Sequence, residues 1–215
     1  PNNPGAEDYF LGFPPFVHNG RNSSFQVDSS EYEILERAVK VSNSVEGLTC
    51  EIGLRMGGGT KKIMDLSNKI HIAIDPYGNI EYKPDENTTT RLDYTNFMKH
   101  ETLSKLHEYS KQKNFIFFPL EDYEFFERFQ HGVPVYNNKK ETVNVYSCVH
   151  VDGPHDLTSV EKTFEFFKDR IPSGGTIVFD DYTVYPHIEK LHNYIISCGF
   201  ELLDRGHVKI SYIRN

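Results

Sequence analysis

The most constraining feature of this sequence is a regular alternation between short apolar runs and longer stretches in which apolar residues have helical spacing. The apolar runs are short enough to be buried strands. Strands that alternate with helices form βαβ units, in which a parallel sheet is covered on both faces. We expect strands at residues 48–52, 70–74, 115–118, 143–151 and 176–179, and helices at 60–68, 93–111, 157–170 and 186–199.

The C-terminal end of the chain departs from this alternation. Residues 200–203 and 208–213 both have strand character, and Asp204-Arg205-Gly206 between them is a tight turn. Two strands joined by so short a turn can only be antiparallel. We therefore predict an α/β fold: a Rossmann-like, doubly wound, mostly parallel sheet with an antiparallel C-terminal strand, in a single domain.

We divide the chain into an N-terminal arm with a leading helix, residues 1–46, and a main domain, residues 47–215. The arm, residues 1–28, combines prolines and glycines that break any period with several aromatic residues. Such a segment either packs on the body or forms a lid over a substrate site.

Two helix starts carry the spacing of a capping box, in which a hydroxyl and a carboxylate three residues later satisfy free backbone amides. Ser30 and Glu33 have this spacing at the start of the leading helix, which is expected to end near Asn43. Thr158 and Glu161 have it at the start of the later helix.

The composition excludes several classes of function. The 215 residues carry a formal net charge of −8, which disfavours nucleic acid as the main partner. No apolar run approaches the roughly 20 residues of a membrane span, so no membrane partner is expected. The three cysteines lie in apolar stretches, which is typical of buried thiols in a reducing compartment, and we expect a cytoplasmic protein.

A glycine-rich turn follows the first strand of the main domain, in the segment from Glu51 to Thr60. Glycines here allow the backbone to approach a ligand closely, although the spacing matches neither a dinucleotide fingerprint nor a phosphate loop. Asp75 ends the second strand, where a carboxylate can accept both hydroxyls of a ribose. Together these features predict an adenosine-type ligand across the first two strands.

Four polar side chains follow the fourth and fifth strands: Asp152, His155, Asp180 and Asp181. Strand ends in a doubly wound sheet are neighbours, so we expect these groups to converge. Adjacent carboxylates raise the pKa of one another, and a hard dication such as Mg²⁺ relieves this repulsion. In the alternative interpretation, Asp180 or Asp181 caps the next helix and His155 is a loop residue.

In this order the motifs resemble those of class I S-adenosylmethionine-dependent methyltransferases, and more narrowly the metal-dependent sugar O-methyltransferases related to macrocin O-methyltransferase. The resemblance covers about residues 47–213. It rests on Glu51-x-Gly53-x-x-x-Gly57-Gly58, Asp75, Asp152-Gly153-x-His155, Pro172-x-Gly174-Gly175 and Asp180-Asp181-Tyr182.

The resemblance implies S-adenosylmethionine (SAM) as cofactor, with Asp75 on the ribose and Glu121 near the adenine. The cofactor-binding residues it implies are Glu51, Gly53, Gly57, Gly58, Thr60, Asp75, Tyr77, Glu121 and Asp152. Residues 121–142 match no part of the family pattern beyond this loose assignment of Glu121. Tyr77, Tyr182 and Tyr185 are also candidates to line a sugar or aromatic pocket.

The resemblance further implies that Asp152, Asp180 and Asp181 bind Mg²⁺ or another hard divalent cation. His155 is then the general base, and Asp152 joins it in the catalytic set. The expected partner is a small molecule with an acceptor hydroxyl, for which a sugar is favoured, and a homo-oligomer is compatible with the sequence.

Three other functions compete with this one. A nicotinamide-dependent oxidoreductase would need a different glycine motif and usually lacks the reversed strand. An adenosine-binding module without catalysis would not need the Asp and His set. A methyltransferase of the same fold that works without a metal would use His155 or an aspartate alone.

Overall fold

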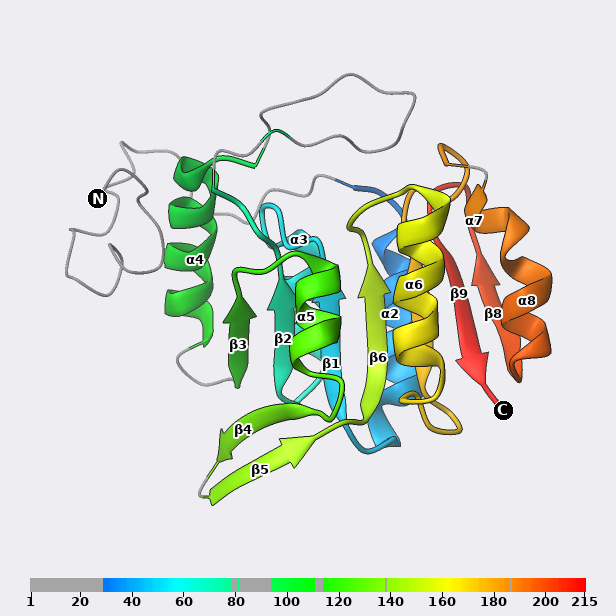
Figure 1. The fold of residues 1–215 in the computed structure, drawn as a ribbon, viewed down its shortest axis with the longest axis horizontal. Coiled ribbons are helices and arrows are strands. Elements are labelled where there is room, and N and C mark those ends of the chain that lie inside the picture. Colours follow the sequence, from blue (N-terminus) through cyan, green and yellow to red (C-terminus); the bar gives the residue numbers. More distant parts are fainter. Residues whose placement is uncertain (1–28, 79–80, 82–93, 111–113, 138, 186) are drawn as a thin grey trace.

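The computed structural model describes residues 29–215, apart from 79–80, 82–93, 111–113, 138 and 186. The described residues form a seven-stranded sheet whose first five strands are parallel (Figure 1). Across the sheet the order is β3 (Phe115–Phe118), β2 (His71–Ile74), β1 (Leu48–Ile52), β6 (Tyr146–Val151), β7 (Thr176–Phe179), β9 (Ile210–Arg214) and β8 (Phe200–Arg205). Strand β9 runs antiparallel to β7 and to β8. The predicted fold class is confirmed.

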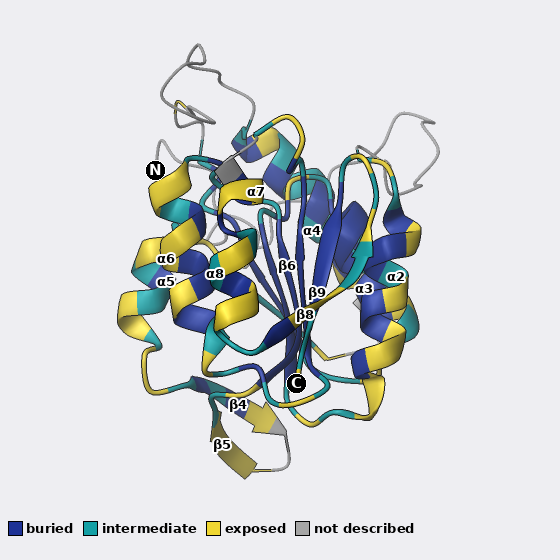
Figure 2. Cartoon of the chain, turned by 90° about the vertical axis from the view of Figure 1, so that its right-hand side faces the viewer, coloured by how far each residue is buried: buried dark blue, intermediate teal, exposed yellow. Residues whose placement is uncertain are grey.

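Helices cover both faces of the sheet, and the central strands are buried along their whole length (Figure 2). One face carries α2 (Tyr32–Val41), α3 (Gly58–Leu66) and α4 (Asn96–Ser110). The other carries α5 (Asp122–Arg128), α6 (Leu157–Lys168), α7 (His187–Lys190) and α8 (His192–Ser197). Burial on both faces explains why the strands are near-continuous apolar runs in the sequence.

Both capping-box predictions are wrong. Helix α2 starts after Glu31, whose side chain does not cap the helix; its carboxylate accepts hydrogen bonds from the backbone amides of residues 207–209. Helix α6 is capped by Asp156, which accepts a hydrogen bond from the amide of Ser159 at 3.0 Å. At α6 a carboxylate two residues before Thr158 caps the helix, whereas no side chain caps the N-terminus of α2.

Residues 121–142, for which the sequence suggested no role beyond that of Glu121, form α5 and most of a separate hairpin. The hairpin consists of β4 (Val133–Asn137) and β5 (Lys139–Val143), and Figure 1 shows it projecting from the lower end of the sheet. The strand expected at 143–151 is therefore shorter, because Val143 pairs with Val133 in the hairpin.

Most other boundaries agree with the prediction within a few residues. A short 3₁₀ turn (Ser42–Ser44) ends the leading helix near Asn43, as expected. The single helix expected at 186–199 is two short helices, α7 and α8, and Ile196 is 39% exposed rather than buried. Within the described ranges, no helix is both long and apolar enough to cross a membrane. The arm at 1–28 and the polar stretch at 82–91 lie outside the described residues.

Candidate active site

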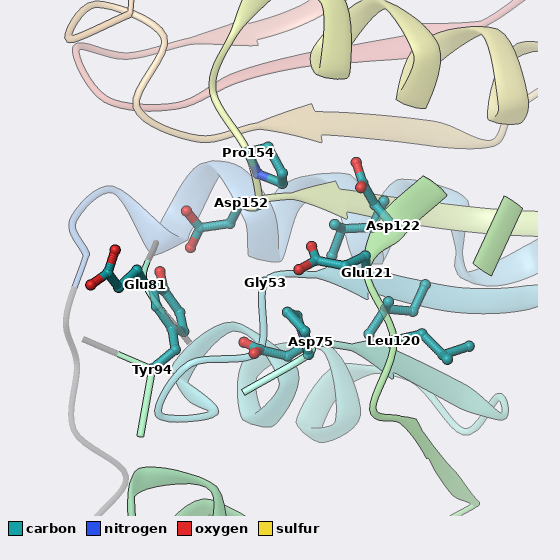
Figure 3. A pocket seen from close by; sticks show the side chains of 13 residues that line it. Gly53, Asp75, Glu81, Tyr94, Leu120, Glu121, Asp122, Asp152 and Pro154 are labelled. Carbon is teal, nitrogen blue, oxygen red and sulfur yellow. The ribbon is translucent and has the colours of Figure 1, made fainter. Parts of the chain in front are cut away.

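The carboxyl ends of β1, β2, β3 and β6 surround an open pocket at the edge of the sheet (Figure 3). Its walls include three predicted cofactor-binding carboxylates, Asp75, Glu121 and Asp152, together with the predicted Gly53. The remaining lining residues are Ile52, Ile74, Pro76, Glu81, Tyr94, Leu120, Asp122, Gly153 and Pro154. This is the position at which α/β sheets bind nucleotide-like ligands.

Asp75 is buried at the end of β2 and is held by the loops on either side. One carboxylate oxygen accepts the backbone N–H of Arg55 at 2.9 Å, and the other accepts that of Tyr77 at 3.0 Å. Burial raises the pKa of Asp75 to about 7, although these backbone hydrogen bonds oppose the shift. The carboxylate is thus fixed in orientation at the pocket wall and titrates near neutral pH.

The glycines of the turn allow close packing of the loops after β1 and β6. Gly53 has a φ of +86°, and a Cβ at this position would lie 2.0 Å from the carbonyl oxygen of Asp152. Gly57 has a φ of +81° and precedes the first residue of α3, Gly58. The glycine at 53 therefore brings the pocket wall from β1 against the wall from β6.

Three predicted cofactor-binding residues do not line the pocket but form hydrogen bonds beside it: Glu51, Thr60 and Tyr77. Glu51 is buried, accepts a hydrogen bond from the Thr60 hydroxyl and lies 2.7 Å from Nδ1 of His150. The Tyr77 hydroxyl donates to the carbonyl oxygen of Arg55, which fixes the loop after β1. Gly57 and Gly58 also lie outside the lining. Contact of these residues with a cofactor stays a prediction.

Metal-ligating side chains gather in two overlapping groups beside the pocket. In one group the ligand atoms of His150, Asp152 and Asp180 lie within 4.8 Å of one another. In the other, those of Asp152, His155 and Asp181 do so. The predicted carboxylates therefore converge, with Asp152 shared by both groups and a histidine contributing to each.

The pKa values of Asp152 and Asp180 shift in opposite directions because their neighbours differ. Burial and the nearby Asp180 raise the pKa of Asp152 well above its ordinary value. Burial would also raise the pKa of Asp180, but the His150 ring and the Lys209 ammonium lower it. Lys209 is fully buried, and its Nζ lies 2.6 Å from a carboxylate oxygen of Asp180.

His155 sits at the outer side of this cluster, in the loop after β6. Its ring stacks on the Tyr185 ring with centroids 4.4 Å apart and planes 6° apart. Its Nε2 lies 3.9 Å from a carboxylate oxygen of Asp181, whose side chain is 39% exposed. The imidazole is therefore oriented by its neighbours and faces the more accessible carboxylate, as a proton acceptor for an entering substrate requires.

A family comparison decides the class of protein. Residues 50–182, which include both carboxylate groups and the pocket carboxylates, match the model of a family described as a methyltransferase domain. The chain belongs to the methyltransferase domain family. The prediction of a class I SAM-dependent methyltransferase is confirmed at the level of family and fold, and the nicotinamide-dependent oxidoreductase is the wrong class. A search among curated proteins gives no match.

Solved structures share the methyltransferase fold at low sequence identity. The O-methyltransferase TomG from Streptomyces achromogenes, solved with SAM, has a TM-score of 0.61 at 8% identity and covers 98% of this chain and 97% of its own. The O-methyltransferase NovP has a TM-score of 0.60 at 14% identity, with coverages of 85% and 78%. CalS11, a TDP-rhamnose 3′-O-methyltransferase, has a TM-score of 0.54 at 13% identity, with coverages of 84% and 77%.

Sequence reasoning missed several residues of this methyltransferase site. Asp122 follows Glu121 directly after β3 and lines the pocket, and burial raises its pKa. Its position after a predicted strand was a usable signal. His150 and Lys209 carried no signal, because each lies inside a segment predicted as a strand, and the sequence does not show which side chains meet there.

Proposed function

We propose that this methyltransferase moves the methyl group of SAM to a hydroxyl oxygen of a small polyhydroxylated acceptor, a sugar or a glycosylated molecule, with the help of a divalent cation. The observation that carries the proposal is the position of Asp152. This residue lines the pocket, and its carboxylate belongs to both groups of side chains that could hold a metal ion. A cofactor in the pocket would therefore adjoin a cation at these carboxylates.

The acidic lining of the pocket suits the positive groups of SAM. SAM carries a sulfonium and an amine, and the pocket walls contain five carboxyl side chains: Asp75, Glu81, Glu121, Asp122 and Asp152. Asp75 lies where a carboxylate accepts ribose hydroxyls in folds of this kind. When bound, SAM supplies a methyl group that is already electrophilic, so the chain needs chiefly to align an acceptor oxygen and to remove its proton.

The donor set also fits a divalent cation. The expected ligands are Asp152, Asp180 and Asp181, the cation predicted from the sequence is Mg²⁺, and oxygen donors suit a hard ion. When bound, such a cation lowers the pKa of a hydroxyl that it contacts. Burial and the charge of Asp180 raise the pKa of Asp152 and of Asp181, and a cation beside these carboxyl groups would favour their ionised forms.

His155 is the proposed general base. The acceptor hydroxyl gives its proton to Nε2 of His155, the ring nitrogen that faces Asp181. The oxygen forms a bond to the methyl carbon as the bond from carbon to sulfur breaks, and the sulfur keeps that electron pair. Stacking on Tyr185 holds the imidazole in place for this transfer.

A sugar acceptor is supported by the resemblance to the macrocin-related enzymes and by the fold shared with CalS11. The test is transfer of a labelled methyl group from SAM to a panel of nucleotide-linked sugars and catechols, with a divalent cation or with EDTA. We expect labelled product from a sugar acceptor only when a cation is present. Binding of NAD in place of SAM would refute the proposal.

A second candidate is metal-independent methyl transfer, because Lys209 already places one positive charge on Asp180. Asp181→Ala separates the two. With a metal, we expect this variant to lose turnover while SAM affinity, measured by calorimetry, falls much less. Full wild-type activity after exhaustive chelation would establish the metal-independent route.

A further inference from the structure

His150 is a buried histidine with one ring nitrogen bonded and the other not. It lies on β6 directly beside Glu51 of β1, two residues before Asp152, and its side chain is 1% exposed. Nδ1 lies 2.7 Å from the Glu51 carboxylate. Nε2 is buried without a hydrogen-bond partner among the described residues. A buried polar atom of this kind requires an explanation, because leaving it unpaired is costly.

In a neutral His150, the hydrogen bond made by Nδ1 determines whether Nε2 carries a proton or a lone pair. The Glu51 carboxylate already accepts the Thr60 hydroxyl, and a carboxylate can only accept, so Nδ1 of His150 donates its proton to Glu51. In a neutral imidazole Nε2 then carries the lone pair. A histidine that donates one N–H to a carboxylate is the usual arrangement for a metal-ligating histidine.

The lone pair of Nε2 faces carboxylate oxygen. Nε2 lies 3.8 Å from Oδ2 of Asp180, which is too long for a hydrogen bond. Asp152 contributes a third ligand atom within 4.8 Å of both. Metal–nitrogen and metal–oxygen bonds are each about 2.0–2.2 Å, so a single ion can contact Nε2 and a carboxylate oxygen across this gap.

The charges around the gap favour a dication. The side chains that surround it include three carboxylates, Glu51, Asp152 and Asp180, and one ammonium, Lys209. These carboxyl groups outnumber the ammonium groups three to one, and a dication beside them would favour their ionised forms. Lys209 lies 2.6 Å from Oδ2 of Asp180, the oxygen that Nε2 faces, and 2.6 Å from the Ser29 hydroxyl, and so supports that carboxylate as a donor.

We propose that His150 is a metal ligand, which together with Asp152 and Asp180 forms a nitrogen-containing cation site that prefers a first-row transition dication to Mg²⁺. The inference rests on the proposed metal dependence and names the metal class. Mg²⁺ prefers oxygen ligands and gives up its waters reluctantly, whereas imidazole suits later first-row ions.

The first experiment measures metal affinity on the full chain by calorimetry, with Co²⁺ and Mg²⁺ as the probes and with no SAM or acceptor. We expect Co²⁺ to bind the wild type more tightly than Mg²⁺. His150→Gln should weaken Co²⁺ binding by about tenfold or more and leave Mg²⁺ affinity much less changed. Equal Co²⁺ affinity in wild type and His150→Gln would overturn the proposal.

The second experiment uses Mn²⁺ as a spectroscopic probe and does not depend on folding of the His150 variant. Pulsed EPR detects directly bound ¹⁴N, and ¹⁵N-histidine labelling identifies the nitrogen as imidazole. We expect the coupling to persist in His155→Gln, because the only other histidine beside these carboxylates in the described part of the chain is His150. Loss of the coupling in His155→Gln would assign the nitrogen to His155 and refute the proposal.

These measurements need no turnover. Absence of methyl transfer with every cation would refute the proposed function and leave the metal result intact. Methyl transfer supported by Mg²⁺ alone, with no nitrogen coupling to Mn²⁺, would keep the proposed function and refute the assignment of His150.

Discussion

The proposed role of Asp75 in binding the ribose hydroxyls of SAM depends on pH. The side chain sits in the pocket wall with both oxygens held by backbone amides, and burial raises its pKa to about 7. An ionised carboxylate accepts two ribose hydroxyls, whereas the protonated form accepts them less well. Its environment therefore makes cofactor binding sensitive to pH in the neutral range.

We expect SAM to bind more tightly as pH rises through about 7, and Asp75→Asn to bind weakly with little pH dependence. Calorimetry from pH 5.5 to 8.5 on both proteins tests this. A wild-type affinity that is flat across pH 7 would contradict the role given to Asp75.

The same pKa shift affects stability with a definite sign. The unfolded carboxyl loses its proton near 3.8 and the folded one near 7, so between these values the folded state holds more protons. The contribution of Asp75 to the free energy of unfolding therefore falls as pH rises from about 4 to 7. The difference between wild type and Asp75→Asn, followed by urea unfolding across this range, should show that trend.

Lys209 is the only ammonium paired with Asp180 among the described residues, and both side chains are buried. Lys209→Met leaves Asp180 as a buried charge without its ion-pair partner, which costs about 3–5 kcal/mol of stability. The double variant Lys209→Met with Asp180→Asn should recover much of that loss, as measured by chemical unfolding. An unchanged single variant would mean that Asp180 is neutral in the folded protein.

At the scale of elements, the sequence predicted the strands better than the helix ends. Central strands are buried on both faces, so their apolar runs are visible without knowledge of their partners. A helix start is decided by one side chain and the local backbone angles, and several nearby residues compete for that role. The N-cap of α6 is Asp156, whereas the capping-box spacing in the sequence had favoured Thr158.

Substitutions of Asp156 and of Thr158 form a matched pair of variants that tests which residue caps α6. Asp156→Ala should lower the free energy of unfolding by about 1 kcal/mol, the usual cost of losing an N-cap. Thr158→Ala, at an exposed position inside the first turn, should cost much less. Urea unfolding of the two variants compares them directly, and a larger loss for Thr158→Ala would restore the capping box predicted from the sequence.

The loops after β1 and β6 form a second unit at this scale. A Cβ at residue 53 would lie 2.0 Å from the Asp152 backbone, and φ is positive there. Gly53→Ala should therefore weaken SAM binding and metal binding together, because it displaces the residue they share. Calorimetry with each ligand measures both, and loss of only one would show that the two sites are independent.

For the molecule as a whole, the sequence predicted the sheet, the reversed strand and the edge at which the site lies. Asp75 and Asp152 followed from the rule that ligands bind at strand ends, and Glu121 from the resemblance to the methyltransferases. The sequence did not predict which buried polar side chains pair with one another next to that edge. Glu51 and His150 are 99 residues apart; Asp180, directly after β7, and Lys209, directly before β9, are 29 apart. Periodicity reports which face a residue occupies and carries no information about its partner.

A hydrogen-bond network joins the two residues Ser29 and Glu31, which precede α2, to Asp180 and Lys209. Ser29 donates to Asp180 at 3.0 Å and accepts from Lys209 at 2.6 Å, while Glu31 binds the backbone amide of Lys209 at 3.0 Å. Substitutions at 29, 31, 180 and 209 should therefore have non-additive effects. In an evolving lineage these four positions would change in concert, and a homologue with a different residue at 209 should differ at 29 as well.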